Sequence, residues 1–110
     1  RAMAVREAYA EKLRAAMTRK DPAIRDFFDL FYAVREIGLD SQDPDFLSMA
    51  KAKLEVPGNA PVDVSAERKR ELDPQLEGQL KPVLWPADFV RFNFDEAFVL
   101  VCSMAKAVSV

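Results

Sequence analysis

The first residues with chemical potential are two cations on the apolar side of an expected helix. Between residues 4 and 18 apolar side chains recur every three or four positions, which is the helical period. At about 100° per residue, Lys12 falls within this apolar stripe, and Arg19 falls on nearly the same line. Such cations either extend their charged ends to the edge of the core, pair with internal acids, or line a cleft that receives an anion.

A second expected helix presents Arg25, Asp26 and Asp29 together on a narrow polar strip, opposite an apolar face. One interpretation is that the strip is the solvent face of the helix. An ion pair between Arg25 and Asp29 would then contribute roughly 0.2–0.5 kcal/mol to helix stability. The other interpretation is that the strip presents its charges to a substrate.

These two stretches carry recognisable motifs. Residues 11–15 have the pattern E-K-x-x-A, Arg19 follows, and residues 25–30 have the pattern R-D-x-x-D-L. In order and spacing they resemble the late motifs of the AbiEii/AbiGii toxin family of nucleotidyltransferases. The resemblance covers residues 4–32, and beyond them it rests on a helical tail.

The resemblance implies a divided enzyme. In that family an N-terminal half of the nucleotidyltransferase fold carries a G-S motif with metal-binding acids, and a helical C-terminal half completes the active site. The enzymes transfer a nucleotidyl group from a nucleoside triphosphate with Mg²⁺. Several are bacterial toxins of type IV toxin–antitoxin or abortive-infection systems, and tRNA is a target of some. The implied partners are therefore a nucleoside triphosphate, an RNA or protein acceptor, and an antitoxin.

The same resemblance implies roles for single residues. Lys12, Arg19 and Arg25 would form the nucleotide-binding side, with Arg25 also holding the acids in place. Asp26 and Asp29 would be the catalytic acids, which orient the reacting groups or act as base. These roles suit phosphoryl-type transfer, which depends on positioning and on cations aimed at developing negative charge.

Several features predict that the chain is a piece of a larger protein. It contains no Gly-Ser pair, so the family's metal-binding motif is missing, and we expect no metal site and no transfer by this chain alone. It begins with Arg1 rather than Met. We expect residues 1–110 to form one helical domain, the C-terminal half of the parent.

Composition limits the chemistry further. Hydrophobic residues make up 50% of the chain and charged residues 31%, which is typical of a folded domain. The net charge of −2 lacks the basic excess of an electrostatic nucleic-acid binder. The absence of histidine excludes Ser/His and Cys/His catalysis, and the single cysteine, Cys102, excludes a disulfide scaffold. We expect a cytoplasmic protein, because no apolar run is long enough to span a membrane and no signal core is visible.

The elements that must position these residues are all helical. We expect an orthogonal all-α domain of five to six helices. The second, from about residue 22 to residue 36, is apolar over most of its circumference, so we expect it to be the most buried, and Gly38 should end it. Asp-Pro pairs beginning at Asp21, Asp43 and Asp73 predict three helix starts, because Asp caps free amides and Pro tolerates the first helical position.

The second half of the chain is less regular. We expect two short helical turns between residues 66 and 80, because Pro74 interrupts the pattern. Residues 89–94 alternate like a strand, but with no partner strand they are better explained as an extended linker or a helical turn. A last helix should follow, capped by Asp95.

Two further features favour surface or packing roles. The charged run of residues 67–71 is typical of a solvated face, although Arg68, Lys69 and Arg70 could touch RNA phosphates in a full enzyme. Trp85 is expected to anchor the core or a lid rather than stack on a base. The alternative function is a non-catalytic module that binds an antitoxin or a second copy of itself as a homodimer.

Overall fold

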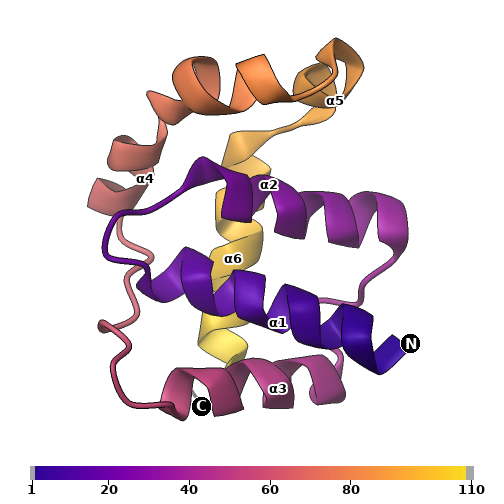
Figure 1. The fold of residues 1–110 in the computed structure, drawn as a ribbon, viewed down its shortest axis with the longest axis vertical. Helices are drawn as coiled ribbons and strands as arrows, with labels where there is room; N and C mark the ends of the chain where they lie inside the picture. The colour runs from indigo at the N-terminus through magenta and orange to yellow at the C-terminus, as the bar shows by residue number, and fades with distance from the viewer. Residues whose placement is uncertain (1, 109–110) are drawn as a thin grey trace.

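Helices account for nearly all of the regular structure in the computed structural model, which describes residues 2–108 and side chains from residue 5 onward (Figure 1). The α-helices are α1 (Ala2–Thr18), α2 (Ile24–Tyr32), α3 (Pro44–Glu55), α4 (Ala66–Leu72), α5 (Pro86–Arg91) and α6 (Phe94–Val108). Two π-helical segments, η1 (Ala33–Ile37) and η2 (Leu76–Leu80), and one 3-10 turn, η3 (Lys81–Val83), complete them. No strand forms within residues 2–108, so the all-α prediction is confirmed. Arg1 lies outside the described residues.

Three helices lie side by side across a fourth. α1 lies between α2 and α3, and α6 runs crosswise behind them (Figure 1). This is the orthogonal packing expected from the sequence. α4, η2 and α5 form an outer arm, and η2 is the part of it that contacts α2. The arm brings residues far along the sequence back to the loop between α1 and α2.

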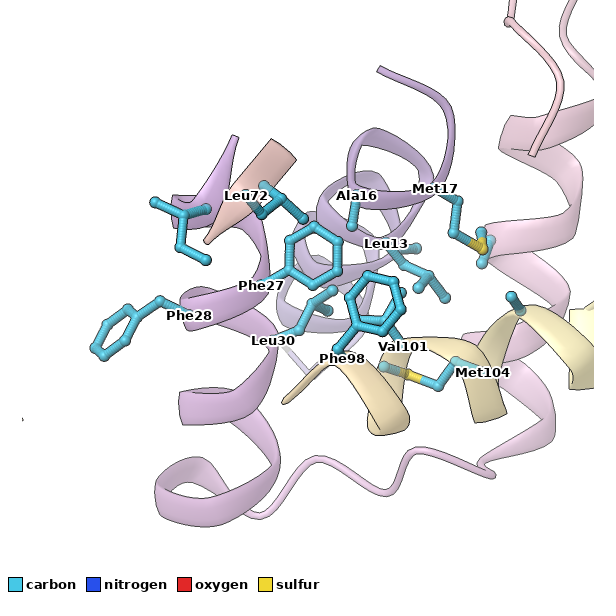
Figure 2. Packing of buried hydrophobic residues seen from close by; sticks show 14 of the residues in the cluster. Leu13, Ala16, Met17, Phe27, Phe28, Leu30, Leu72, Phe98, Val101 and Met104 are labelled. Carbon is cyan, nitrogen blue, oxygen red and sulfur yellow. The ribbon is translucent and has the colours of Figure 1, made fainter. Parts of the chain in front are cut away.

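The core is centred on the buried face of α2. Phe27 is fully buried, stacks on Phe98 with 5.7 Å between ring centroids, and meets Phe94 edge to face at 6.2 Å (Figure 2). Aromatic pairs of this kind add to the free energy gained by burying their area. The apolar side of α6 packs against this face, and the prediction that α2 is central is confirmed.

One of the four expected Asp caps is present. The side chain of Asp43 accepts a hydrogen bond from the Phe46 amide, with Pro44 as the first residue of α3. At α2 the prediction was wrong, because the helix begins at Ile24 and Asp21 is not its cap. Gln75 replaces it: its Oε1 accepts from the Ile24 amide at 2.8 Å and its Nε2 donates to the Pro22 carbonyl at 2.9 Å. A side chain from the outer arm therefore does what a local Asp was expected to do.

The other two expected caps are also wrong. Asp73 ends α4 in helical conformation instead of starting a helix, although the break after it divides residues 66–80 into two short helices as predicted. At α6 the cap is Asn93, whose Oδ1 accepts from the Glu96 amide at 3.0 Å. Asp95 lies in the first turn and pairs with Lys69 Nζ at 2.6 Å. Gly38, with φ of 87°, ends the η1 segment as expected.

Arg68 lies inside the molecule, contrary to the expectation of a solvated face. It is 3% exposed. Its Nε and Nη2 donate to the Ala16 carbonyl at 3.0 and 2.8 Å, and Nη2 also donates to the Arg19 carbonyl at 3.0 Å. Carbonyls at a helix C-terminus lack partners within the helix and carry partial negative charge. The guanidinium satisfies them and joins α4 to the end of α1.

The outer arm also explains the position of Trp85. This residue is 78% exposed, so the expectation of a core anchor was wrong. Trp85 precedes the first residue of α5, which lies away from the core. The strand-like residues 89–94 form the end of α5, a two-residue break and the start of α6, so this stretch combines helical ends with a short linker and contains no strand.

Replacement of Arg68 by Met should lower the free energy of unfolding by about 2–3 kcal/mol, because a buried carbonyl and a partly buried one lose a charged donor. Urea denaturation measures this change. The matched control is Arg70→Met on the exposed side of α4, for which we expect a change within about 0.5 kcal/mol. Equal losses in the two variants would contradict the role assigned to Arg68.

Candidate functional site

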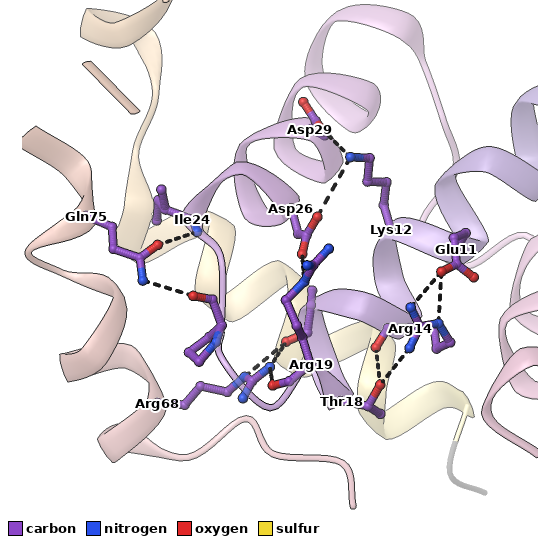
Figure 3. A network of polar contacts seen from close by, with 12 residues as sticks. Glu11, Lys12, Arg14, Thr18, Arg19, Ile24, Asp26, Asp29, Arg68 and Gln75 are labelled. Atoms are coloured by element: carbon purple, nitrogen blue, oxygen red, sulfur yellow. Dashed lines mark hydrogen bonds and ion pairs between the residues drawn. The ribbon is translucent and has the colours of Figure 1, made fainter. Parts of the chain in front are cut away.

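The five candidate site residues meet where the second half of α1 packs against the start of α2. Lys12 lies on α1, Arg19 directly follows it, and the other three lie on the first two turns of α2. Figure 3 shows Lys12 and Arg19 pointing toward the acids of α2. We call these residues the charged cluster: Lys12, Arg19, Arg25, Asp26 and Asp29. The structure therefore brings together all the side chains that the motifs singled out.

Cations and acids alternate along the cluster. Asp26 faces Arg19 Nε with Oδ2 at 3.1 Å and Lys12 Nζ with Oδ1 at 3.8 Å. Asp29 faces Lys12 Nζ with Oδ2 at 3.0 Å and Arg25 Nε with Oδ1 at 3.0 Å. Each of the four carboxylate oxygens thus faces a cation, and Lys12 lies between the two acids and serves one oxygen of each.

The acids lie beneath the cations. The side chain of Asp26 is 3% exposed and that of Asp29 is 19% exposed, whereas the three cations are between 39% and 52% exposed. The cluster contains three cations and two acids, so its formal net charge is one positive unit. The outer side of the cluster is therefore positive, and an anion can approach it without meeting a carboxylate first.

The ion pairs decide between some of the alternatives for Lys12 and Arg19 and for the polar strip on α2. Lys12 and Arg19 pair with internal acids, which was one of the three possibilities. The Arg25–Asp29 ion pair is present as expected. The strip is not simply a solvent face, however, because α1 covers Asp26.

Burial and charge act in opposite directions on Asp26. Burial raises the pKa of this carboxyl above its ordinary value, and the positive charges of Arg19 and Lys12 lower it by a smaller amount. The negative charge of Asp29 adds to the rise. Asp26 therefore holds a proton more readily than an exposed aspartate does.

Sequence reasoning missed two residues near the cluster. Tyr9 was counted only as part of the apolar stripe, yet burial and then the charge of Asp29 raise the pKa of its hydroxyl. Its position three residues before Lys12 on the same helix face was the available signal. Arg68 holds the backbone carbonyl of Arg19, and nothing local in the sequence indicated that contact.

The cluster does not provide a magnesium site of its own. Among the side chains of residues 5–108, no group of three or more Cys, Asp or Glu residues could hold a metal ion. The oxygens of Asp26 and Asp29 are each directed at a cation, which does not fit the ligand set of a divalent metal. What the cluster can do is hold an anion and orient groups beside it.

Comparison with known proteins agrees with the motifs. A family model described as nucleotidyl transferase AbiEii toxin, type IV TA system, matches residues 1–98. The chain belongs to the AbiEii family. The match contains the whole charged cluster and extends well beyond the residues 4–32 on which the resemblance was first based, so that resemblance is confirmed. No curated protein and no solved structure matched the chain.

The described helices give no indication of a membrane-spanning segment. No helix within residues 2–108 is both long enough and apolar enough to cross a bilayer.

We predict that Arg19→Ala raises the pKa of Asp26 more than Lys12→Ala does. Arg19 is the closer cation and also donates a hydrogen bond to Asp26, so its loss removes the larger stabilisation of the charged form. Carbon-detected NMR titration of the aspartate carboxyls measures both shifts. Asp63 is the control, because hydrogen bonds from Ser65 lower its pKa.

The raised pKa of Asp26 in the wild-type chain also affects the stability of the fold. The folded pKa of Asp26 lies above the unfolded value, so the folded state binds more protons between the two values. The contribution of this carboxyl to the free energy of unfolding therefore declines as pH rises through that interval. A wild-type pKa for Asp26 at or below that of an exposed aspartate would contradict the assignment.

Proposed function

We propose that this chain supplies the helical half of an AbiEii nucleotidyltransferase active site and that its charged cluster binds the triphosphate of the substrate. The full-length protein would transfer a nucleoside monophosphate from a nucleoside triphosphate to an RNA such as tRNA or to a protein, and this chain alone would be inactive. The observation that carries the proposal is the cluster itself: half-exposed cations held over two shielded acids.

The cations would act on the phosphates. Lys12, Arg19 and Arg25 are held in place by acids yet remain between 39% and 52% exposed, so they are ordered before the substrate arrives. Fixed cations of this kind stabilise the negative charge that develops on a transferring phosphoryl group. No rearrangement of α1 or α2 is needed for them to meet an anion.

The two acids would have different roles. Asp26 is shielded from solvent, so it acts as the anchor that positions Lys12 and Arg19. Asp29 is more exposed and lies next to both Lys12 and Arg25, so it is the acid that can reach the acceptor group. A catalytic base must come within hydrogen-bond distance of the proton that it removes, which favours Asp29 for that role.

Magnesium would accompany the nucleotide in the full-length enzyme, as the family implies. Because the acids of the described residues do not fit a magnesium site, we assign no step of the metal to this chain. The contribution of this chain is electrostatic positioning by its own cations and acids.

A second candidate function is a protein-interaction module. Val83, Trp85 and Val90 are 63%, 78% and 82% exposed around the start of α5. Exposed apolar side chains gathered on one segment are typical of a contact surface. An antitoxin, which the toxin family suggests as a partner, or a second copy of the chain would cover them. The two functions are compatible within one toxin.

The proposal is tested by transfer of label from α-labelled nucleoside triphosphates, with Mg²⁺, into total RNA or lysate. We expect the full-length protein to transfer label and this chain alone to transfer none. Lys12→Ala in the full-length protein should reduce transfer by about 100-fold or more, because it removes a cation that stabilises the transition state. Lys51→Ala, which changes an exposed lysine of α3, is the matched control and should retain activity. A folded full-length protein that labels no acceptor would favour the interaction module.

The division of roles between the acids has its own test. In the full-length protein, Asp29→Asn should lower kcat with little change in KM for the nucleotide, because the base is lost. Asp26→Asn should instead raise KM for the nucleotide, because Lys12 and Arg19 lose their anchor. Circular dichroism checks that both variants are folded. A kcat defect confined to Asp26→Asn would reverse the assignment.

A further inference from the structure

A small pocket with aromatic walls lies beside the charged cluster. It forms where the end of α2 and the η1 segment meet α5 and the extended residues before α6. The rings of Phe28, Tyr32 and Phe92 line it, and Arg35, Asp88 and Arg91 stand among them. Its volume of about 200 Å³ is below the roughly 300–1,000 Å³ of sites for drug-sized ligands. The pocket therefore suits a single planar ring system.

The walls form a fixed aromatic frame. Phe92 meets Phe28 at 5.5 Å between centroids and Phe31 at 5.4 Å, both close to edge-to-face. Phe28 and Phe31 are each only 7% exposed, so packing holds them, whereas Tyr32 is 39% exposed. Tyr32 packs on Phe28 with 5.9 Å between ring centroids, so its exposed ring is supported and can stack on a flat ligand, and such stacking tolerates every nucleobase.

The charged side chains that line the pocket indicate what kind of ligand it could bind. Arg91 Nη1 and Asp88 Oδ1 lie 3.8 Å apart, so a donor and an acceptor stand side by side. A nucleobase edge presents acceptors that pair with arginine and amino groups that pair with a carboxylate. The pocket is balanced in charge, because Glu36 also lines it and the two acids match Arg35 and Arg91. The Arg35 guanidinium lies 4.9 Å from the centroid of the Phe31 ring and so already occupies one cation–π position.

Phe28, one wall of the pocket, also contacts the cluster. The Arg25 guanidinium carbon lies 5.7 Å from the centroid of the Phe28 ring, and Arg25 Nε donates to Asp29 at 3.0 Å. A phosphate held at the cluster and a ring held in the pocket would thus be neighbours. That is the arrangement of phosphate and base within one nucleotide or one strand.

From this geometry we propose that the aromatic pocket binds one nucleobase, stacked on the exposed ring of Tyr32 and paired through its edge with Arg91 and Asp88. The base belongs either to the nucleoside triphosphate or to an unpaired nucleotide of an RNA acceptor. The choice between these two sources rests on the proposed function, whereas recognition of a base by the pocket can be measured on this chain alone.

The first experiment is an amide NMR titration of this chain with guanosine, cytidine, GMP, CMP and, as a probe without a base, ribose 5-phosphate. We expect the nucleosides and both monophosphates to shift signals of residues 32–36 and 88–92, which lie outside the charged cluster, and ribose 5-phosphate to leave them unchanged. Tyr32→Ala and Arg91→Ala should each weaken binding of the monophosphates by roughly 10-fold, as expected for the loss of one stacking or edge contact. Arg91 is 66% exposed, so its replacement does not disturb the core, and Lys51→Ala is the matched surface control.

Nucleosides that shift no signals, or that shift only signals remote from the pocket, would overturn the proposal. So would equal shifts from ribose 5-phosphate, because the base would then contribute nothing.

The second experiment distinguishes the sources of the base in the full-length protein. If the triphosphate supplies it, Arg91→Ala raises KM for the nucleotide and leaves KM for the RNA unchanged. If the acceptor supplies it, the same variant raises KM for the RNA. Equal KM values in the variant and the wild type for both substrates would overturn the role of the pocket in transfer. Failure of the proposed function would give a different result. The full-length protein would transfer no label, while the isolated helical chain would still bind nucleosides.

Discussion

A carboxylate removed from water is tolerated only where cations and donors surround it, and Asp26, at 2% exposure, depends on this condition. Its two cations come from the other side of a helix–helix contact: Lys12 from α1 and Arg19 from the residue after α1. The positions of α1 and α2 are therefore tied to each other by charge as well as by the core. A shift of either helix would leave a buried charge without a partner, which is more costly than the loss of a surface ion pair.

The outer arm supports that arrangement from the far end of the sequence. Arg68 on α4 satisfies the carbonyls of Ala16 and Arg19, and Gln75 satisfies polar groups at the start of α2. The loop between α1 and α2 is thus held by two long side chains rather than by its own residues. Because Arg68 contacts the backbone of Arg19, whose side chain pairs with Asp26, the arm and the charged cluster form one connected network (Figure 3).

The same packing determines where positive charge and aromatic rings lie at the surface. Shielding of the acids leaves a positive outer side on a chain whose net charge is −2, so local arrangement and not overall composition creates the place where an anion can bind. The aromatic pocket arises where α2 continues as the η1 segment. The π-helical segment brings Arg35 to the pocket, and short π-helical stretches occur frequently at functional sites. The charged cluster and the aromatic pocket therefore both draw residues from α2.

The sequence by itself determined the all-helical class, the central position of α2, the end of the following η1 segment at Gly38 and the family, because hydrophobic period and motif spacing are local properties. It also singled out every member of the charged cluster, since two short motifs on successive helices contained them all. Tertiary structure alone decided that Arg68 points inward, that Trp85 points outward, and that Gln75 and Asn93 replace Asp21 and Asp95 as caps. The physical reason is that a polar side chain or an unpaired backbone group is satisfied by whichever partner packing brings nearest, and that partner can be fifty residues away in sequence, as Gln75 is from Ile24.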